Sequence, residues 1–403
     1  MTVPGTPAGQ QTVRRHNLSL ITTALAGPPA SRAELAHRTG LTKATVSSLV
    51  DVLISQTILV EGVPDAPRVG RPARPVRLNP DGPVAVGLEI NVDYLAACAL
   101  DLTGQVRGYR HAPVDNRGRT ADQVVAHAVR LSDEVRAGLD QPLLGVALAL
   151  PGVVGVDGEL LRAPNLPLLA GARLGQALAG ELNLRELQVD NEANLGALAR
   201  LWSAPDGGRD FVYVSGEIGV GAGLVVNGEL FRGVNGFAGE LGHVVVERDG
   251  PLCGCGGRGC VEQYAGQEVL LRNAEQPDIE ALEAAVTRSD PRALAAVELA
   301  GSALGVGLSS LLNVVDLPAI VLGGVYARLY RVIEPALTAE LASRVLSSRS
   351  SDGRLCCSSL GVDAAVRGAA GAVVDRALKD PGRFTEWDAS SDSSSPSRAR
   401  RTG

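Results

Sequence analysis

Aromatic side chains are scarce in this 403-residue chain, at 3% of all residues beside a hydrophobic content of 45%. Long apolar runs are missing as well, since none approaches the ~20 residues that span a bilayer. The first ten residues hold no basic segment followed by an apolar one, so we expect no signal peptide. These absences argue against a membrane partner, and a length of 403 residues is enough for two or three domains.

Cysteine is also rare, with six residues in the chain. Three of them, Cys98, Cys356 and Cys357, stand outside any motif, and the last two are adjacent, an arrangement in which cysteines seldom pair. A disulfide framework is therefore not expected, and a reducing cytoplasm is the expected location.

Charge is distributed unevenly along the chain. Residues 1–80 hold nine Lys and Arg against four Asp and Glu, a net charge of +5. Because the whole chain has a net charge of −6, the remaining residues carry −11. A basic head on an acidic body predicts a polyanionic partner for the head alone. The alternative is a basic face that is merely solvated.

The basic head begins with three expected helices. They are expected at residues 12–26, 32–38 and 43–54, after a disordered arm at residues 1–11. Ser31 and Glu34 form a capping box for the second helix, and Thr42 caps the third. Because Gly40 allows a tight turn between these two helices, the pattern is typical of a helix-turn-helix.

The exposed start of the third helix carries short polar side chains and one lysine. The candidate DNA contacts there are Thr42, Lys43, Thr45, Ser47 and Ser48. Side chains of this kind at a recognition helix bind base edges and phosphates. An ordinary three-helix bundle with a polar face would show the same spacing.

An arginine-rich segment between two short expected strands favours DNA binding. The strands are expected at residues 57–63 and 75–79, and Arg68, Arg71 and Arg74 lie between them. Gly-Arg-Pro keeps the backbone extended, so that arginines can enter a narrow minor groove. The segment resembles an AT-hook core, and residues 12–80 are predicted to be a winged helix-turn-helix domain that binds a double-stranded DNA operator.

One histidine and three cysteines further along have the spacing of a metal site. These residues are His243, Cys253, Cys255 and Cys260. Cys3His sets close a tetrahedral zinc site with no open position, so the predicted Zn²⁺ is structural. The alternative is a glycine-rich turn with free thiols. Glu240 and Glu262 flank the loop although zinc does not need them, which suggests that the loop positions something else.

This stretch resembles the signature of the ROK family, which contains repressors, uncharacterised reading frames and sugar kinases. The matching runs are Glu240-Leu-Gly-His243 and Cys253-Gly-Cys255-Gly-Gly-Arg-Gly-Cys260-Val-Glu262. The resemblance covers roughly residues 84–375. It implies a two-lobed, actin-like, hexokinase-type effector domain at residues 84–380, which carries the zinc loop, and leaves a disordered tail at 385–403.

The expected elements of this body agree with an α/β fold in which strand pairs and crossing helices occur twice. Strands or hairpins are expected at 84–110, 143–150, 187–190, 211–231 and 319–322. Helices are expected at 121–138, 173–181, 194–203, 267–273, 278–287, 290–315, 326–344 and 363–378.

The resemblance also implies a sugar pocket. In the family's kinases the catalytic base lies in Asn-Asp-Ala-Asn, and here the run is Asn191-Glu192-Ala193-Asn194, which keeps a carboxylate. The candidate sugar-binding residues are Asn165, Asn191, Glu192, Glu240, His243 and Glu262. Asn165 is included on loop position alone. The alternative for Asn191 and Glu192 is capping of the helix that follows them.

The two phosphate-binding loops of the kinases are altered. The first reads Glu89-Ile-Asn-Val-Asp93 where the kinases have Asp-x-Gly-Gly-Thr, and the second begins Glu217-Ile-Gly where they have Gly-Thr-Gly. Phosphate cradles need close backbone N–H groups and no negative charge nearby. Asp93 and Glu217 should repel ATP, so no catalytic residue and no enzyme activity are expected.

The sequence therefore predicts a sugar-responsive transcriptional repressor similar to xylose-repressor-type members, acting as a homodimer on an inverted-repeat operator. Two other functions stay open. One is an active ATP-dependent sugar kinase with an added DNA-binding head, and the other is a DNA-binding scaffold controlled by a protein partner.

Overall fold

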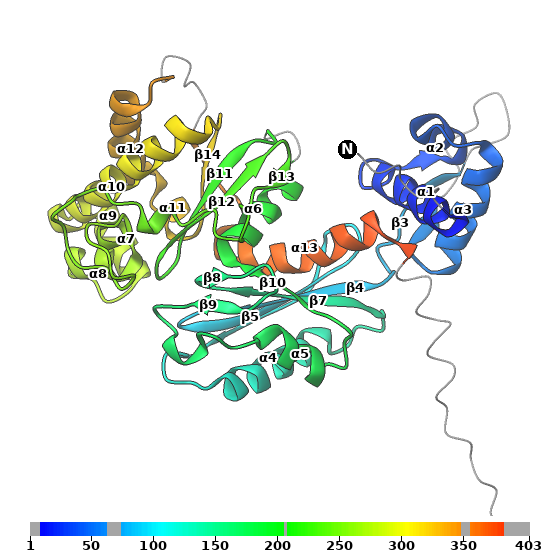
Figure 1. Ribbon diagram of the computed structural model, residues 1–403, viewed down its shortest axis with the longest axis horizontal. Helices are drawn as coiled ribbons and strands as arrows, with labels where there is room; N and C mark the ends of the chain where they lie inside the picture. Colours follow the sequence, from blue (N-terminus) through cyan, green and yellow to red (C-terminus); the bar gives the residue numbers. More distant parts are fainter. Residues whose placement is uncertain (1–8, 63–73, 205–207, 348–354, 383–403) are drawn as a thin grey trace, which may run out of the picture.

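A computed structural model describes residues 9–62, 74–204, 208–347 and 355–382. A small N-terminal head stands beside a larger body of two lobes (Figure 1). The predicted tail at 385–403 and most of the predicted arm lie outside the described residues. Helix α1 (Gln10–Ala24) begins two residues earlier than expected.

The head consists of three helices and a small sheet of order β1-β3-β2. After α1 come β1 (Ala30–Ser31), α2 (Arg32–Thr39), α3 (Lys43–Ser55), β2 (Leu59–Glu61) and β3 (Pro75–Leu78). The capping box of Ser31 and Glu34 is present, and the Thr42 hydroxyl accepts a hydrogen bond from the Thr45 N–H. Strand β2 is shorter than predicted because Thr57 adopts a left-handed turn conformation, with φ 59°.

The first lobe is built on a five-stranded sheet of order β6-β5-β4-β7-β10. The strands are β4 (Val84–Ile90), β5 (Tyr94–Leu100), β6 (Val106–Pro113), β7 (Leu143–Leu150) and β10 (Gln188–Asn191). The first three are antiparallel, whereas β7 and β10 add in parallel after crossover segments that contain α4 (Ala121–Arg136) and α5 (Leu174–Glu181). The second crossover also holds β8 (Val153–Val154), β9 (Leu160–Arg162) and the short helix η1 (Pro167–Leu169).

The second lobe repeats this strand order as β13-β12-β11-β14-β15. Its strands are β11 (Phe211–Gly216), β12 (Val220–Val226), β13 (Glu229–Leu230), β14 (Ile320–Leu322) and β15 (Leu355–Cys357). Its helices are η2 (Leu241–His243), α7 (Glu262–Ala265), α8 (Gln267–Ala274), α9 (Ile279–Thr287), α10 (Pro291–Val315), α11 (Gly324–Arg328), α12 (Tyr330–Arg344) and η4 (Gly361–Asp363). The repetition confirms the predicted two-lobed α/β fold.

Two helices connect the lobes with each other and with the head. Helix α6 (Glu192–Ser203) packs on β12 and on α13 (Ala364–Lys379), and α13 also covers β4 and β7 (Figure 1). The contact is close, since a Cβ built at Gly368 would lie 1.9 Å from the Leu195 carbonyl oxygen. At its far end α13 meets α1, where the Leu378 carbonyl accepts a hydrogen bond from the Thr22 hydroxyl. One continuous apolar core therefore includes residues of the head and of the first lobe.

One expectation for the second lobe needs correction, and one helix needs an assignment. The single helix predicted at 326–344 is two helices, α11 and α12, separated at Leu329. Helix α10 is long and apolar enough to cross a membrane by length and composition. Its buried side chains, among them Leu304 and Leu308, pack in the core of the lobe, so we assign it as a core helix.

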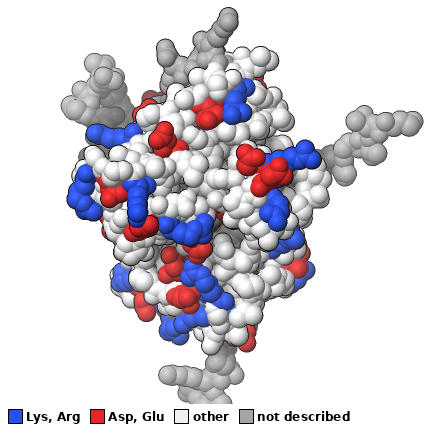
Figure 2. Space-filling view, turned by 90° about the vertical axis from the view of Figure 1, so that its left-hand side faces the viewer, with Lys and Arg blue, Asp and Glu red and all other residues white. Residues whose placement is uncertain are grey.

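Acidic and basic side chains are interspersed on the outer face of the second lobe (Figure 2). Several basic side chains of this lobe are in ion pairs, such as Arg328 with Glu280 and Glu283, and Arg344 with Glu340. Because a nucleic-acid interface needs a field of positive charge, this face does not resemble one.

Candidate functional site

One cleft contains residues of both lobes and brings together every residue predicted to bind sugar. The predicted residues in its lining are Asn165, Asn191, Glu192, Glu240, His243 and Glu262. They come from four places in the chain: the loop after β9, the junction of β10 and α6, the turn at η2 and the first residue of α7. The cleft also contains Asn91 and several glycines, among them Gly152, Gly219 and Gly236.

Asn191 is held by its own hydrogen bonds at the start of α6. Its side-chain oxygen accepts from the N–H groups of Ala193 and Asn194, at 2.8 and 3.3 Å, and its amide nitrogen donates to the Gly152 carbonyl at 2.9 Å. The capping role considered for Asn191 is therefore present. Capping also explains why α6 begins at Glu192 and not at residue 194.

Asp190 also stabilises the junction of β10 and α6 by hydrogen bonds. One carboxylate oxygen accepts from the Asn191 N–H and the Asn194 amide, at 2.8 and 2.9 Å. The other accepts from Nε and Nη2 of Arg232, the first of these at 3.1 Å. Arg232 begins the segment that continues to the cleft residues Gly236 and Glu240, so this ion pair joins two walls of the cleft.

Glu192, which lines the cleft, lies near the buried carboxyl group of Glu89. The Asn91 amide donates to Glu192 Oε2 at 3.1 Å and to Glu89 Oε1 at 3.3 Å, and the Tyr94 hydroxyl donates to Glu89 Oε1 at 2.6 Å. Burial raises the pKa of Glu192 to about 8, and the neighbouring charge of Glu89 adds to this shift. Burial also raises the pKa of Glu89 to about 7, although its hydrogen bonds from Tyr94 and Asn91 oppose the shift. Near neutral pH this part of the cleft can therefore hold a proton on a carboxyl group and donate it in a hydrogen bond.

The predicted metal ligands lie together beside this cleft, and one of them, His243, also lines it. One ligand atom from each of His243, Cys253, Cys255 and Cys260 lies within 4.8 Å of all the others. Two of these separations are 3.7 Å, between the Sγ atoms of Cys255 and Cys260 and between Cys253 Sγ and His243 Nδ1. Tetrahedral zinc with Zn–S bonds of ~2.3 Å places its sulfur ligands ~3.8 Å apart, so the group has the dimensions of a metal site.

His243 joins this group to the cleft. Its Nδ1 faces the cysteines, while its Nε2 lies 4.0 Å from the Glu240 carboxylate. Burial raises the pKa of Glu240, which lies in the cleft beside this ring. A metal on Nδ1 would fix the tautomer that carries the proton on Nε2, leaving that N–H available to the cleft.

The glycine loop after β11 binds a carboxylate of the protein itself. The Val220 N–H donates to Glu262 Oε2 at 3.3 Å, and a Cβ built at Gly219 would lie 2.4 Å from the same oxygen. Glu217 lies against Gly324 at the start of α11, and burial raises its pKa well above the ordinary value. Asp93, expected to repel ATP from within the site, is exposed.

In the head, Thr42, Lys43 and Ser48 are exposed on the first turns of α3, and Thr45 is half-buried with its hydroxyl bonded to that of Thr42. Ser47 is turned inward, where its hydroxyl accepts a hydrogen bond from Arg32. Arg74 is 65% exposed and lies 3.7 Å from Glu61. Arg68 and Arg71 lie outside the described residues.

Comparison with known proteins decides the family. The ROK family profile matches residues 85–376. The chain is 30% identical over 384 residues to the xylose repressor of Bacillus subtilis (strain 168), across 92% of this chain and 98% of that protein. This protein belongs to the ROK family.

Other relatives differ in how much of the chain they match. A glucokinase of Halalkalibacterium halodurans is 30% identical over 268 residues, which is 59% of this chain and 79% of that protein. A solved ROK family transcriptional regulator, described as a homologue of the E. coli MLC protein, superposes with a TM-score of 0.78 at 24% identity, covering 93% of this chain and 99% of that one. Like the B. subtilis repressor, this regulator matches more of the chain than the body alone contains, so the shared architecture includes the head.

For this ROK protein, sequence reasoning missed three groups that support the cleft. The sequence places Glu89 and Asn91 in an altered phosphate loop, whereas in the structure the Asn91 amide donates a hydrogen bond to Glu89 and another to the pocket carboxylate Glu192. Arg232 was not singled out, and its partner Asp190 lies 42 positions away. The one sequence feature that could have indicated these groups is the excess of acidic residues in the two altered loops.

Proposed function

We propose that this protein is a transcriptional repressor that binds an operator through its head and releases it when a sugar occupies the cleft. The observation that carries the proposal is the continuous packing from cleft to head, in which α6 begins at Glu192, packs on α13, and α13 ends against α1. The full-length similarity to a xylose repressor supports the same function and makes xylose the first sugar to test.

For the head, we propose the division expected from the sequence, with a winged helix-turn-helix at 12–80 and an effector domain at 84–380. Thr42, Lys43, Thr45 and Ser48 would face the major groove, and the wing arginines Arg68, Arg71 and Arg74 the minor groove. Ser47 would support α3 through Arg32. A homodimer on an inverted-repeat operator in the cytoplasm is the assembly that such a head favours.

For the metal group, we propose Zn²⁺ held by His243, Cys253, Cys255 and Cys260. Its contribution would be structural, since a Cys3His set leaves no open position. The fixed His243 ring would then present its Nε2–H to a sugar hydroxyl, beside the carboxylates of Glu240 and Glu262.

Kinase activity is not part of the proposal. Glu262 accepts the hydrogen bond of the Val220 N–H in the glycine loop, and Glu217 lies against Gly324. A phosphate would have to displace one carboxylate and approach another, both of them of its own sign. Because kinases also occur among the relatives, ATP belongs in the first experiment.

The test is thermal stabilisation of the metal-loaded protein by a panel of pentoses, hexoses and N-acetyl sugars, with ATP in parallel. A ligand that binds only the native state raises the melting temperature by mass action. A shift with one sugar and none with ATP is expected, and that sugar should then weaken operator binding. A shift with ATP would instead favour the kinase, and no shift with any compound would favour control by a protein partner.

A further inference from the structure

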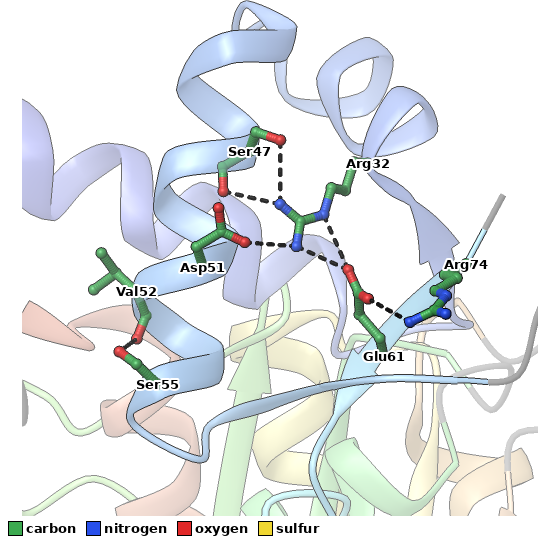
Figure 3. A network of polar contacts seen from close by, with 7 residues as sticks. All are labelled: Arg32, Ser47, Asp51, Val52, Ser55, Glu61 and Arg74. Atoms are coloured by element: carbon green, nitrogen blue, oxygen red, sulfur yellow. Dashed lines mark hydrogen bonds and ion pairs between the residues drawn. The ribbon is translucent and has the colours of Figure 1, made fainter.

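The Arg32 side chain joins three elements of the head (Figure 3). It belongs to the first turn of α2, and its three nitrogens all donate hydrogen bonds. Nη1 donates to the carbonyl and the hydroxyl of Ser47, both at 3.1 Å, and Nη2 donates to Asp51 at 2.7 Å. Nε and Nη2 also donate to Glu61 Oε1, at 3.2 and 2.8 Å.

These contacts fix α3, the proposed recognition helix, relative to β2 and β3, which we call the wing strands. Ser47 and Asp51 lie on successive turns of α3, so two turns of that helix are held by one planar group. Glu61 ends β2, and its second oxygen lies 3.7 Å from Arg74 Nη1, just before β3 begins. The Gly62 N–H donates to the Pro75 carbonyl at 2.7 Å and closes the same strand pair.

We propose that Arg32 is a positioning residue for operator recognition, which holds α3 and the wing strands as one unit without binding DNA itself. The inference rests on the proposed operator binding by the head. A winged head must place its helix in one groove and its wing in another at the same time, so a fixed angle between them lowers the entropy cost of binding. Arg32 suits this role because its donors are committed within the head and its side chain is 28% exposed.

If Arg32 acted only through its charge, replacing it together with its two acidic partners would change DNA affinity in the opposite direction. Arg32 neutralises Asp51 and Glu61, and acids near a DNA-binding surface repel phosphates. Replacing all three as Arg32→Met, Asp51→Asn and Glu61→Gln removes one positive and two negative charges, so the head becomes more basic by one charge. If charge alone matters, DNA binding becomes tighter, whereas loss of positioning weakens binding to the operator.

The experiment measures the affinity of the full-length dimer for two duplexes over a range of salt concentrations. One duplex is selected from random DNA by the wild-type protein, and the other is a mixed-sequence duplex of equal length. For the triple variant we expect specific affinity to fall about tenfold or more, equivalent to one base contact moved out of reach. Non-specific affinity and the salt slope should be equal to the wild-type values or larger, since no phosphate contact is lost.

Two further variants complete the test. Arg32→Lys keeps the charge but offers three N–H donors on a flexible stem, so it should lose specificity in the same direction. Arg38→Met on the same helix removes an exposed arginine whose one described hydrogen bond, to the Pro28 carbonyl, is 3.5 Å long. It should leave the ratio of specific to non-specific affinity unchanged.

Specific binding by the triple variant that equals or exceeds the wild-type value would overturn the inference. A salt slope smaller by about one would also overturn it, because Arg32 would then be a phosphate contact. A wild-type protein that selects no duplex would instead remove the proposed function itself.

Discussion

At the scale of single residues, Glu89 and Glu192 have raised pKa values, so we expect these two carboxyl groups to make stability depend on pH. Glu89 is 1% exposed and shares the Asn91 amide with Glu192. A buried carboxyl group and a half-buried one that shares its hydrogen-bond donor do not both ionise easily. The fold therefore favours their neutral forms, and a bound sugar would meet at least one hydroxyl donor among them.

The first prediction concerns stability against pH. Burial raises the pKa of Glu89 to about 7 and that of Glu192 to about 8, above the ordinary 4.5. The stabilisation from these neutral groups is complete below about pH 4.5 and is lost as pH rises toward 8. The melting temperature of the sugar-free protein should therefore fall between pH 5 and 8.5, and fall less in Glu192→Gln. Equal slopes in both proteins would mean that Glu192 ionises freely.

The second prediction concerns Arg232, which forms an ion pair with Asp190 beside the turn at Asn191. Arg232→Met leaves the 7%-exposed Asp190 carboxylate without this partner and frees one wall of the cleft. We expect sugar affinity to fall about ten- to a hundredfold, the effect of losing a charge-assisted hydrogen bond of about 1.5–3 kcal/mol. Calorimetric titration measures this, with Arg173→Met, an arginine paired to Asp157 and Glu159, as the control. Equal losses in the two variants would count against a special role for Arg232.

At the scale of elements, the metal loop should be a stabilising unit. Cys255→Ser removes one of four ligands, and we expect loss of bound metal with a fall in melting temperature of about 5 °C or more. Cys357→Ser is the matched control, since Cys357 is exposed on β15. Metal content is measured with a colorimetric chelator after a thiol reagent has released the metal, and the melting temperature is measured by calorimetry. Full metal content in Cys255→Ser would exclude this residue as a ligand.

Elements whose partners are near in sequence could be predicted, and contacts between distant segments could not. The candidate metal ligands span 18 positions and the capping box of Ser31 and Glu34 spans four, so spacing alone indicates them. Asn91 and Glu192 are 101 positions apart, and Arg32 and Glu61 are 29 apart on different elements. Such pairs depend on how the sheets and helices pack, which no local pattern specifies. Strand β1 was missed for a related reason, because its two residues carry no periodicity.

At the scale of the whole molecule, the end of α13 joins the head to the body, beside the apolar core that the two share. The Thr22 hydroxyl donates to the Leu378 carbonyl, and Arg15 pairs with Asp380 just beyond α13. Because the other end of α13 lies beside β4 and α6, a shift of α6 upon sugar binding can move the surface on which α1 rests. A ligand changes DNA affinity only to the extent that it binds the two arrangements unequally.

The last prediction tests this connection. Thr22→Val preserves the shape of the side chain but leaves the buried Leu378 carbonyl without the hydroxyl donor, at a cost of about 1–3 kcal/mol. We expect sugar binding to be unchanged and the ratio of operator affinities without and with sugar to fall several-fold, because the head follows α13 less closely. Operator titrations with and without a saturating concentration of the sugar measure this ratio. Thr23→Val is the control, since Thr23 is exposed one position along the same helix. A ratio that stays at the wild-type value in Thr22→Val, with operator binding intact, would mean that the signal reaches the head by another path.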